Sequence, residues 1–435
     1  MCICFGLNAM PSQTKRESRK PASVMSYSGA LKILHVIPSM SLRTGGPPVS
    51  VTNLSRGLQL LGHMSVVYST SAATPASSNN FRSQIAGDDL PVGASEIDLY
   101  LFSLRSPHRF IYAPSLGQEL RNNAEQFDLI HVHSLYLYPQ LAAWRAATKA
   151  NVPYVVSPRG ALDPYLLKRG RLQKWVLNTL WQKRMLDNAA AIHYTSEEEK
   201  RLAEVINIKA QAFVLPNIVD LAPYGSLPSG ADFREQLRLR SDVPLILNHG
   251  RLSHKKGLDI LIRAMASVVQ VLPSAHLALV GADDENITPT LQRLALDLGI
   301  EKSISFVNPL KGKDLLSALA AAKIWVLPSH GENFGMAVVE AMAAGVPVVC
   351  SPHVNIANEA VAAEALRVSP NSPEILANTI LTILKDPETA KALGRAGRDF
   401  SSRYDLASSA TLYGDFYTQV ICEFQRTFDG PRRGR

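Results

Sequence analysis

Short apolar runs alternate with amphipathic segments along most of this 435-residue chain. In its first half, the apolar runs are LKILHVI, MSVVYS, DLIHVH, PYVVSP, AAIHYT and AFVLPN, with helical apolar spacing in segments such as VSVTNLSRGLQLL. Such alternation of strands and helices is typical of a mostly parallel sheet wrapped by helices. Residues 1–30 lack any periodicity, so we expect a disordered tail there.

The same alternation begins again in the second half, where the strand candidates are PLILNHG, AHLALVG, SISFVN, AKIWVLP and VPVVCS. Turn-forming residues cluster between the halves at 216–230, which predicts a linker. We therefore expect an α/β protein of two doubly wound Rossmann-like domains, residues 31–218 and 219–404, that face each other across a cleft. An amphipathic helix at about 405–428 is expected to cross back to the first domain.

Composition narrows the class of protein. Hydrophobic residues make up 46% and charged residues 19% of the chain, as in globular proteins. The net charge of +8 suits phosphate-bearing substrates, anionic lipids or nucleic acid, and its size alone does not choose among them. No apolar run reaches the roughly 18 to 20 residues that span a bilayer, and the four cysteines show no pairing pattern. These features favour a cytoplasmic enzyme.

The richest chemistry lies in PSHGENFGMAVVEAMAAGVP, residues 328–347, where a strand, a Gly-bearing loop and a helix follow one another. Backbone amides at the start of a helix bind anions, so this turn is expected to cradle a pyrophosphate through Asn333, Phe334, Gly335 and Met336. Glu332 precedes the helix. Glu340 lies within it among apolar residues, where an unpartnered carboxylate is costly.

A second strand, basic loop and helix occupy residues 248–259, NHGRLSHKKGLD. Arg251 offers a planar fork for phosphate oxygens, and Lys256 offers a compact positive charge. Together they suit a diphosphate leaving group, whose negative charge grows as its bond to the sugar breaks. A solvated basic loop is the alternative interpretation.

The spacing from Glu332 to Glu340, with Phe334 and Gly335 between them, resembles the E-x7-E motif of the family 4 retaining glycosyltransferases (glycosyl transferases group 1), which have the GT-B fold. Arg251 and Lys256 match that family's GR...KG signature by position. The resemblance implies that Glu332 contacts the transferred sugar and Glu340 the nucleotide ribose, while Leu310 lies beside the nucleobase.

The resemblance also implies a reaction. A hexose would pass from a UDP- or GDP-sugar to the hydroxyl of a sugar or lipid-linked sugar, with retention of configuration, in polysaccharide or glycolipid biosynthesis. Neither a cofactor nor an obligatory metal ion is expected, and nucleic acid is not an expected partner. The alternatives are a nucleotide-sugar epimerase of the same fold and a non-catalytic regulatory protein. An NAD oxidoreductase is disfavoured because neither first strand-helix turn contains G-x-G-x-x-G.

Three features of the first half bear on the opposite wall of the cleft. Gly45 and Gly46 open the first strand-helix turn, where the family has a Gly-rich loop near the leaving phosphate. His133 ends the strand DLIHVH and is a candidate catalytic residue. In SPRG, Arg159 stands where relatives carry a histidine that binds the donor sugar, and it suggests an anionic group nearby.

Residues 166–186, LLKRGRLQKWVLNTLWQKRML, combine apolar and basic residues in one amphipathic segment. Two interpretations stay open. A helix packed on its own sheet with a charged outer face explains the pattern, and so does peripheral contact with an anionic membrane at the inner face.

Overall fold

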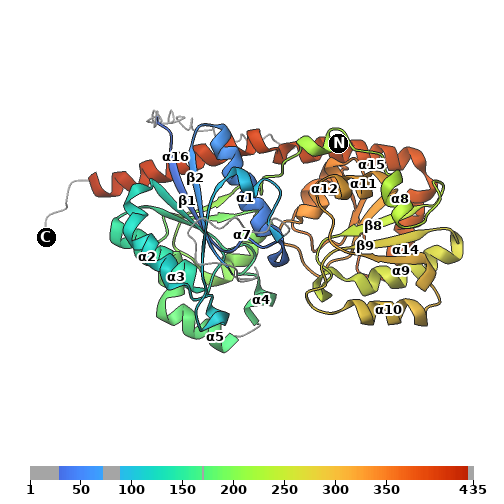
Figure 1. The fold of residues 1–435 in the computed structure, drawn as a ribbon, viewed down its shortest axis with the longest axis horizontal. Helices are drawn as coiled ribbons and strands as arrows, with labels where there is room; N and C mark the ends of the chain where they lie inside the picture. The colour runs from blue at the N-terminus through green and yellow to red at the C-terminus, as the bar shows by residue number, and fades with distance from the viewer. Residues whose placement is uncertain (1–28, 72–88, 169–170, 430–435) are drawn as a thin grey trace, which may run out of the picture.

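The computed structural model describes residues 29–71, 89–168 and 171–429, and its frame is a pair of parallel sheets placed end to end (Figure 1). Within these residues the first sheet has seven strands in the order β3-β2-β1-β4-β5-β6-β7. They are β1 Lys32–Ser39, β2 Met64–Thr70, β3 Asp98–Phe102, β4 Leu129–His133, β5 Tyr154–Ser157, β6 Ala191–Tyr194 and β7 Ala212–Val214. The strand order reverses direction at β1, which is where doubly wound sheets bind their ligands.

The second sheet repeats this plan in the order β10-β9-β8-β11-β12-β13. Its described strands are β8 Leu245–His249, β9 His276–Val280, β10 Ile304–Val307, β11 Ile324–Leu327, β12 Val348–Cys350 and β13 Arg367–Val368. Again the central pair, β8 and β11, flanks the switch in direction. The predicted class of two doubly wound α/β domains is confirmed.

Helices cover both faces of each sheet. Around the first sheet lie α1 Gly46–Leu60, α2 Pro114–Asn123, α3 Tyr138–Ala150, α4 Pro164–Lys168, α5 Arg171–Leu177, α6 Lys183–Asp187 and α7 Glu197–Ala203. Around the second lie α8 Ala231–Gln236, α9 Leu258–Val271, α10 Thr288–Asp297, α11 Gly312–Ala321, α12 Met336–Ala343, α13 Ala357–Ala362, α14 Pro373–Lys385 and α15 Pro387–Ser401. The strands are buried on both sides because apolar clusters fill each space between sheet and helices.

The last helix, α16 Leu406–Asp429, returns from the second domain and runs along the first (Figure 1). Its Tyr413, Phe416 and Tyr417 are buried in one cluster with Ile33 of β1 and Leu54 of α1. The chain also crosses between domains beside the start of α16, where the Val219 amide donates to the Tyr404 carbonyl at 2.9 Å. The expectation of a C-terminal helix crossing back to the first domain is confirmed.

Two parts of the structure differ from the sequence expectations. The edge strands β3 and β13 were not predicted, because one stands beside a polar stretch and the other has only two residues. In the predicted amphipathic segment, α5 leads through a π-helical turn, Asn178–Gln182, into α6, so the helical run from Arg171 to Asp187 is not a regular α-helix throughout. Most of the predicted N-terminal tail lies outside the described residues.

Candidate active site

A cleft of about 910 Å³ lies between the carboxyl ends of the two sheets. It brings together all of the predicted site residues except His133. Those that line it are Gly45, Gly46, Arg251, Lys256, Leu310, Glu332, Asn333, Phe334, Gly335, Met336 and Glu340. The residues come from four separate stretches of the chain, so folding gathers in one place the acids, the cations and the helix terminus that lie apart in the sequence.

Glu332 and Lys256 form an ion pair at the floor of this cleft. Their Oε1 and Nζ atoms are 2.7 Å apart, and each side chain is less than a fifth exposed. The surrounding loops hold the pair in place: the Glu332 amide donates to the His353 carbonyl at 2.9 Å, and the His330 amide donates to the Lys255 carbonyl at 2.8 Å. A bound anion would therefore meet a lysine whose position is already set.

Glu340 projects into the cleft from α12 and is held by a histidine at the end of β8. The indole N–H of Trp325 donates to Nδ1 of His249 at 2.8 Å, so a neutral His249 carries its proton on Nε2. That Nε2 lies 2.9 Å from Oε2 of Glu340 and donates to it. This hydrogen bond holds Oε2 of Glu340 in place. The other carboxylate oxygen is left to accept a hydrogen bond from a ligand hydroxyl.

The N-terminus of α12 points its first amides at the same cleft. Gly335 precedes the helix with φ 88°, a left-handed conformation that side chains disfavour. Phe334 turns inward and packs on Tyr404, with ring centroids 5.2 Å apart. What this turn offers to a ligand is thus main chain and positive dipole rather than side chain.

Contacts across the cleft join the two domains around this turn. The Asn333 amide group donates to Oγ1 of Thr195 at 3.0 Å and to Oε2 of Glu199 at 3.3 Å. Nearby, a Cβ on Gly45 would lie 3.3 Å from Nε of Arg251, so the glycine turn and the exposed arginine approach closely from opposite sides. The predicted Gly45 turn therefore faces the predicted phosphate-binding arginine.

His133 does not reach the cleft, which corrects its expected catalytic place. Its side chain is fully buried, and Nη2 of Arg159 lies 3.0 Å from its Nδ1. Burial lowers the pKa of His133 well below the usual value, and the charge of Arg159 lowers it further. His133 does end β4, as predicted. Its side chain is covered by Arg159, which belongs to the loop after β5.

Arg159 itself lines the cleft and is held by three uncharged partners. Nη1 donates to Oγ of Ser50 at 3.0 Å and to Oδ1 of Asn217, and Nη2 donates to His133. Its backbone has φ 55°, an uncommon value for a residue with a long side chain.

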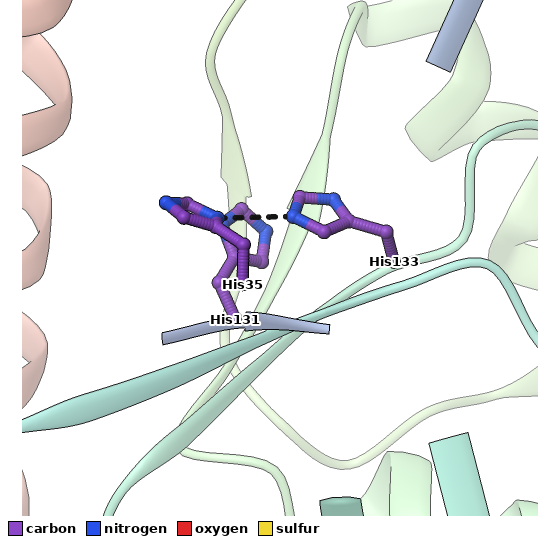
Figure 2. A group of neighbouring side chains, drawn as sticks. All are labelled: His35, His131 and His133. Atoms are coloured by element: carbon purple, nitrogen blue, oxygen red, sulfur yellow. Dashed lines mark hydrogen bonds between the residues drawn. The ribbon is translucent and has the colours of Figure 1, made fainter. Parts of the chain in front are cut away.

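Three histidines below Arg159 are close enough to be considered as metal ligands. Figure 2 shows the rings of His35, His131 and His133 gathered above β1 and β4, and their nitrogens lie within 4.8 Å of one another. An arginine only donates, so Nδ1 of His133 accepts from Arg159, and Nε2 of a neutral His133 then donates to Nδ1 of His35 at 3.1 Å.

The same reasoning orients His131. Nε2 of His193 must donate to the Leu215 carbonyl at 2.9 Å, so its Nδ1 accepts from Nε2 of His131 at 3.3 Å. Nδ1 of His131 then accepts the hydroxyl of Tyr417 at 2.7 Å. In this arrangement each imidazole lone pair of the three is occupied by a hydrogen bond, and a guanidinium lies beside them, which disfavours a cation.

Three further cleft residues were not singled out from the sequence: Asn217, Tyr224 and His249. His249 had a usable signal, because it ends a predicted strand directly before the turn with Arg251. Asn217 and Tyr224 lie in the predicted linker. Turn-forming residues dominate that segment, so its sequence gives no sign that these two side chains make contacts in the cleft. Burial raises the pKa of Tyr224 well above its usual value, and the neighbouring Glu340 raises it further.

Comparisons with known proteins agree with this architecture. The family model "Glycosyl transferase 4-like domain" matches residues 45–217, and "Glycosyl transferases group 1" matches residues 230–400. A D-inositol 3-phosphate glycosyltransferase of Corynebacterium efficiens is 26% identical over 341 residues, which are 74% of this chain and 79% of that protein. A GDP-mannose-dependent monoacylated alpha-(1-6)-phosphatidylinositol monomannoside mannosyltransferase of Corynebacterium glutamicum is 31% identical over 216 residues, 45% of this chain and 55% of that protein.

Among solved structures, Anabaena HepE in complex with UDP and glucose superposes with a TM-score of 0.71 at 20% identity. The match covers 89% of this chain and 99% of HepE, and it shows a shared fold. Two doubly wound α/β domains with a ligand cleft between the carboxyl ends of their sheets form the GT-B fold. The chain belongs to the family 4 glycosyltransferases, whose two domain models together match most of its length, and it is a hexosyltransferase.

Proposed function

We propose that the protein transfers a hexose from a nucleoside-diphosphate sugar, UDP- or GDP-linked, to an acceptor hydroxyl with retention of configuration. The observation that carries this proposal is the convergence of Glu332, Lys256, Arg251 and the α12 N-terminus in one cleft. Support for the donor class comes from the relatives: HepE was solved with UDP and glucose, and the mannosyltransferase is named as GDP-mannose-dependent. The other family member is named for a phosphorylated inositol.

In this proposal the donor lies along the second domain. Arg251, Lys256 and the first amides of α12 hold the diphosphate, and the free oxygen of Glu340 accepts a ribose hydroxyl. Leu310 packs beside the base. Glu332 contacts the hexose, which places its carboxylate beside the bond that breaks.

The reaction follows from the charges in this cleft. As the bond between the anomeric carbon and the phosphate oxygen breaks, negative charge grows on the diphosphate, where Arg251, Lys256 and the helix terminus stabilise it. The acceptor oxygen bonds to the same face of the anomeric carbon, and its proton passes to the departing phosphate oxygen. These cations supply the neutralisation that a metal ion provides elsewhere, so we expect no obligatory metal.

We further propose that the acceptor is a sugar or lipid-linked sugar and that the protein works at the cytoplasmic face of a membrane. Among the described helices, none has the length and apolar character to cross a bilayer. On α5 and the π-helical turn, however, Leu172, Trp175 and Leu180 are each more than 60% exposed. Such apolar exposure beside basic residues suits insertion into the surface of an anionic membrane.

The epimerase alternative gains no support, because the relatives named above are glycosyltransferases. The non-catalytic alternative is also weakened, since the acids and cations of the cleft remain paired and oriented.

The direct test uses UDP-, GDP- and ADP-sugars, each incubated with the wild-type protein and a mixture of candidate acceptors. We expect release of the nucleotide from one donor series, with the sugar found on an acceptor in the anomeric configuration of the donor. Formation of free epimerised nucleotide sugar, or an inverted product, would contradict the proposal.

A further inference from the structure

We propose that Arg159 recognises an anionic group, a carboxylate or phosphate, carried by one of the two substrates beside the reacting sugar. This inference rests on the proposed function and specifies the chemistry of its substrates. The two possible sources share that chemistry: a uronic acid as the transferred sugar, or an acceptor that bears a charged group.

The positive charge of Arg159 has no acidic hydrogen-bond partner within the described residues. Ser50, Asn217 and His133 bind its terminal nitrogens, and all three are uncharged. The acid that most affects it, Glu199, is engaged elsewhere: its Oε1 accepts the Gly160 amide at 2.6 Å, and its Oε2 accepts the Thr195 amide and hydroxyl at 2.8 Å each. The guanidinium therefore lacks a counterion that the protein itself could supply at contact distance.

Of the five N–H groups of Arg159, three donate to Ser50, Asn217 and His133. Nε is buried without a partner in the described part of the chain, so one N–H of Nη2 is left for a ligand. A charged N–H donor suits an oxygen of a carboxylate or phosphate, because a hydrogen bond between charged groups is stronger than one between neutral groups. Uncharged hydroxyls would leave the charge uncompensated.

Keeping the guanidinium here is costly. Burial lowers the pKa of Arg159 below its ordinary value, which reports the penalty of taking the charge out of water. The backbone adds strain through its positive φ of 55°. Backbone strain and a partly buried charge without an acidic hydrogen-bond partner indicate a function for Arg159, because stability alone would not favour them.

The chain at Arg159 passes close to the loop that carries Glu332. A Cβ on the following residue, Gly160, would lie 3.1 Å from Oδ1 of Asn333, and Asn333 directly follows Glu332. The backbone at Arg159 and Gly160 therefore lies on the first-domain wall, beside the loop that carries Glu332. The diphosphate already has Arg251, Lys256 and the α12 amides on the other wall.

The His133 contact makes this charge rigid. The hydrogen-bond chain runs from Arg159 through His133 to His35, and Ser50 on α1 and Asn217 in the linker fix the other end of the guanidinium. Ser50 also donates to Asn217 at 2.7 Å. A cation fixed in advance loses little conformational entropy on binding an anion, so it discriminates strongly between charged and neutral substrates.

The test measures binding by calorimetry in two arms, with wild type, Arg159→Gln and Arg159→Lys. The donor arm compares UDP-glucose with UDP-glucuronic acid, and the GDP-linked pair replaces them if GDP is the nucleotide that binds. The acceptor arm measures binding of inorganic phosphate to protein saturated with the nucleotide, so that the diphosphate site is already filled. Arg43→Gln is the matched control, because Arg43 is an exposed arginine of the same cleft whose charge is opposed by Asp89 at 3.8 Å.

We expect either the preference for UDP-glucuronic acid over UDP-glucose or the affinity for inorganic phosphate to fall about tenfold to hundredfold in Arg159→Gln. The same quantity should be retained in part in Arg159→Lys and be unchanged in Arg43→Gln. The responding arm identifies the source of the anion. The proposal is wrong if the binding measured in neither arm depends on Arg159. It is also wrong if Arg159→Gln weakens binding of the nucleotide alone as much as binding of the charged probe. Circular dichroism checks that each variant is folded, and failure of wild type to bind any nucleotide would overturn the proposed function instead.

Discussion

Glu332 and Lys256 carry opposite charges into the one part of the cleft where a sugar and a diphosphate are expected to meet. In the ligand-free protein each neutralises the other, which limits the cost of keeping both partly buried. A bound diphosphate would draw Lys256 toward its oxygens, while Glu332 would accept a sugar hydroxyl. The pair is thus a resting arrangement whose two members have separate tasks.

Lys256→Gln is expected to weaken UDP or GDP binding about tenfold to hundredfold, because one charge-assisted contact is lost and Glu332 is left unpaired beside the phosphates. Titration calorimetry measures the effect. The neighbouring Lys255→Gln is the control, since it removes the same charge one residue away and has no ion pair with Glu332. Equal losses in the two variants would show that only the total charge of the loop matters.

The buried histidines predict a dependence of stability on pH. Burial lowers the pKa of His35 and of His193 to about 3, so both stay neutral in the folded protein while they gain protons near pH 6.5 when it unfolds. Their contribution is complete above pH 6.5 and is lost as the pH falls toward 3. As the pH falls from 6.5 to 5.5, each of these two histidines should lower the free energy of unfolding by about 1 kcal/mol.

Urea unfolding of His35→Gln at these two pH values tests this account. The loss between pH 6.5 and 5.5 should be smaller than in wild type by about 1 kcal/mol. His108→Gln, at an exposed position, should leave it unchanged. An identical pH dependence in wild type and His35→Gln would contradict the neutral assignment.

Among the loops and helices, the basic loop before α9 is held in position because its backbone packs closely against the backbone of another loop. Gly257 has φ 64°, and a Cβ there would lie 2.1 Å from the carbonyl oxygen of Pro328, in the strand-loop unit that carries Glu332. Two donor-binding loops therefore pack main chain against main chain. A side chain at this point would separate Lys256 from Glu332.

Gly257→Ala is accordingly expected to lower the unfolding free energy by about 2 to 4 kcal/mol, through strain and the clash with Pro328 together. Gly299→Ala is the matched control: it has φ 70° with nothing within 4 Å of the added Cβ, so only the backbone penalty of about 1 kcal/mol applies. Denaturant unfolding compares them, and equal losses would show that the contact with Pro328 is unimportant.

The exposed apolar side chains of α5 and the following π-helical turn are expected to insert into an anionic membrane surface. Replacing Leu172 and Trp175 together by serine should reduce binding to phosphatidylglycerol vesicles by tenfold or more, since roughly 1.5 to 3 kcal/mol is available from each fully buried side chain. Vesicle co-sedimentation is the measurement. Serine at Leu60 and Leu296, which are also exposed, should have little effect. Binding unaffected by the first change would remove α5 from the membrane proposal.

For the molecule as a whole, the sequence predicted those features whose pattern lies within one continuous segment. Strand-loop-helix units around Glu332 and Arg251 could be read locally, and so could the two repeated domains. The edge strand at Arg367–Val368 is too short for a pattern. His133 was expected in the cleft because it ends a strand; its burial and its contact with Arg159, which comes from another strand end, cannot be seen in its own segment.

Contacts between the domains were equally invisible in the sequence. Asn333 was expected to serve through its main chain, yet its side chain also bonds to Thr195, 138 residues away. Asn217 appeared to be a turn former and is a buried partner of Arg159. The Asn333 contact depends on how two finished domains meet, and the Asn217 contact joins segments far apart within the first domain, so no local periodicity reports either.

The most direct test of a cleft that transfers sugar between these domains is the rate of sugar transfer by Glu332→Gln, measured beside its affinity for the nucleotide. We predict that transfer is lost, while the nucleotide binds at least as tightly as to wild type because the competing carboxylate next to Lys256 is gone. Transfer at the wild-type rate by a folded Glu332→Gln protein would contradict it.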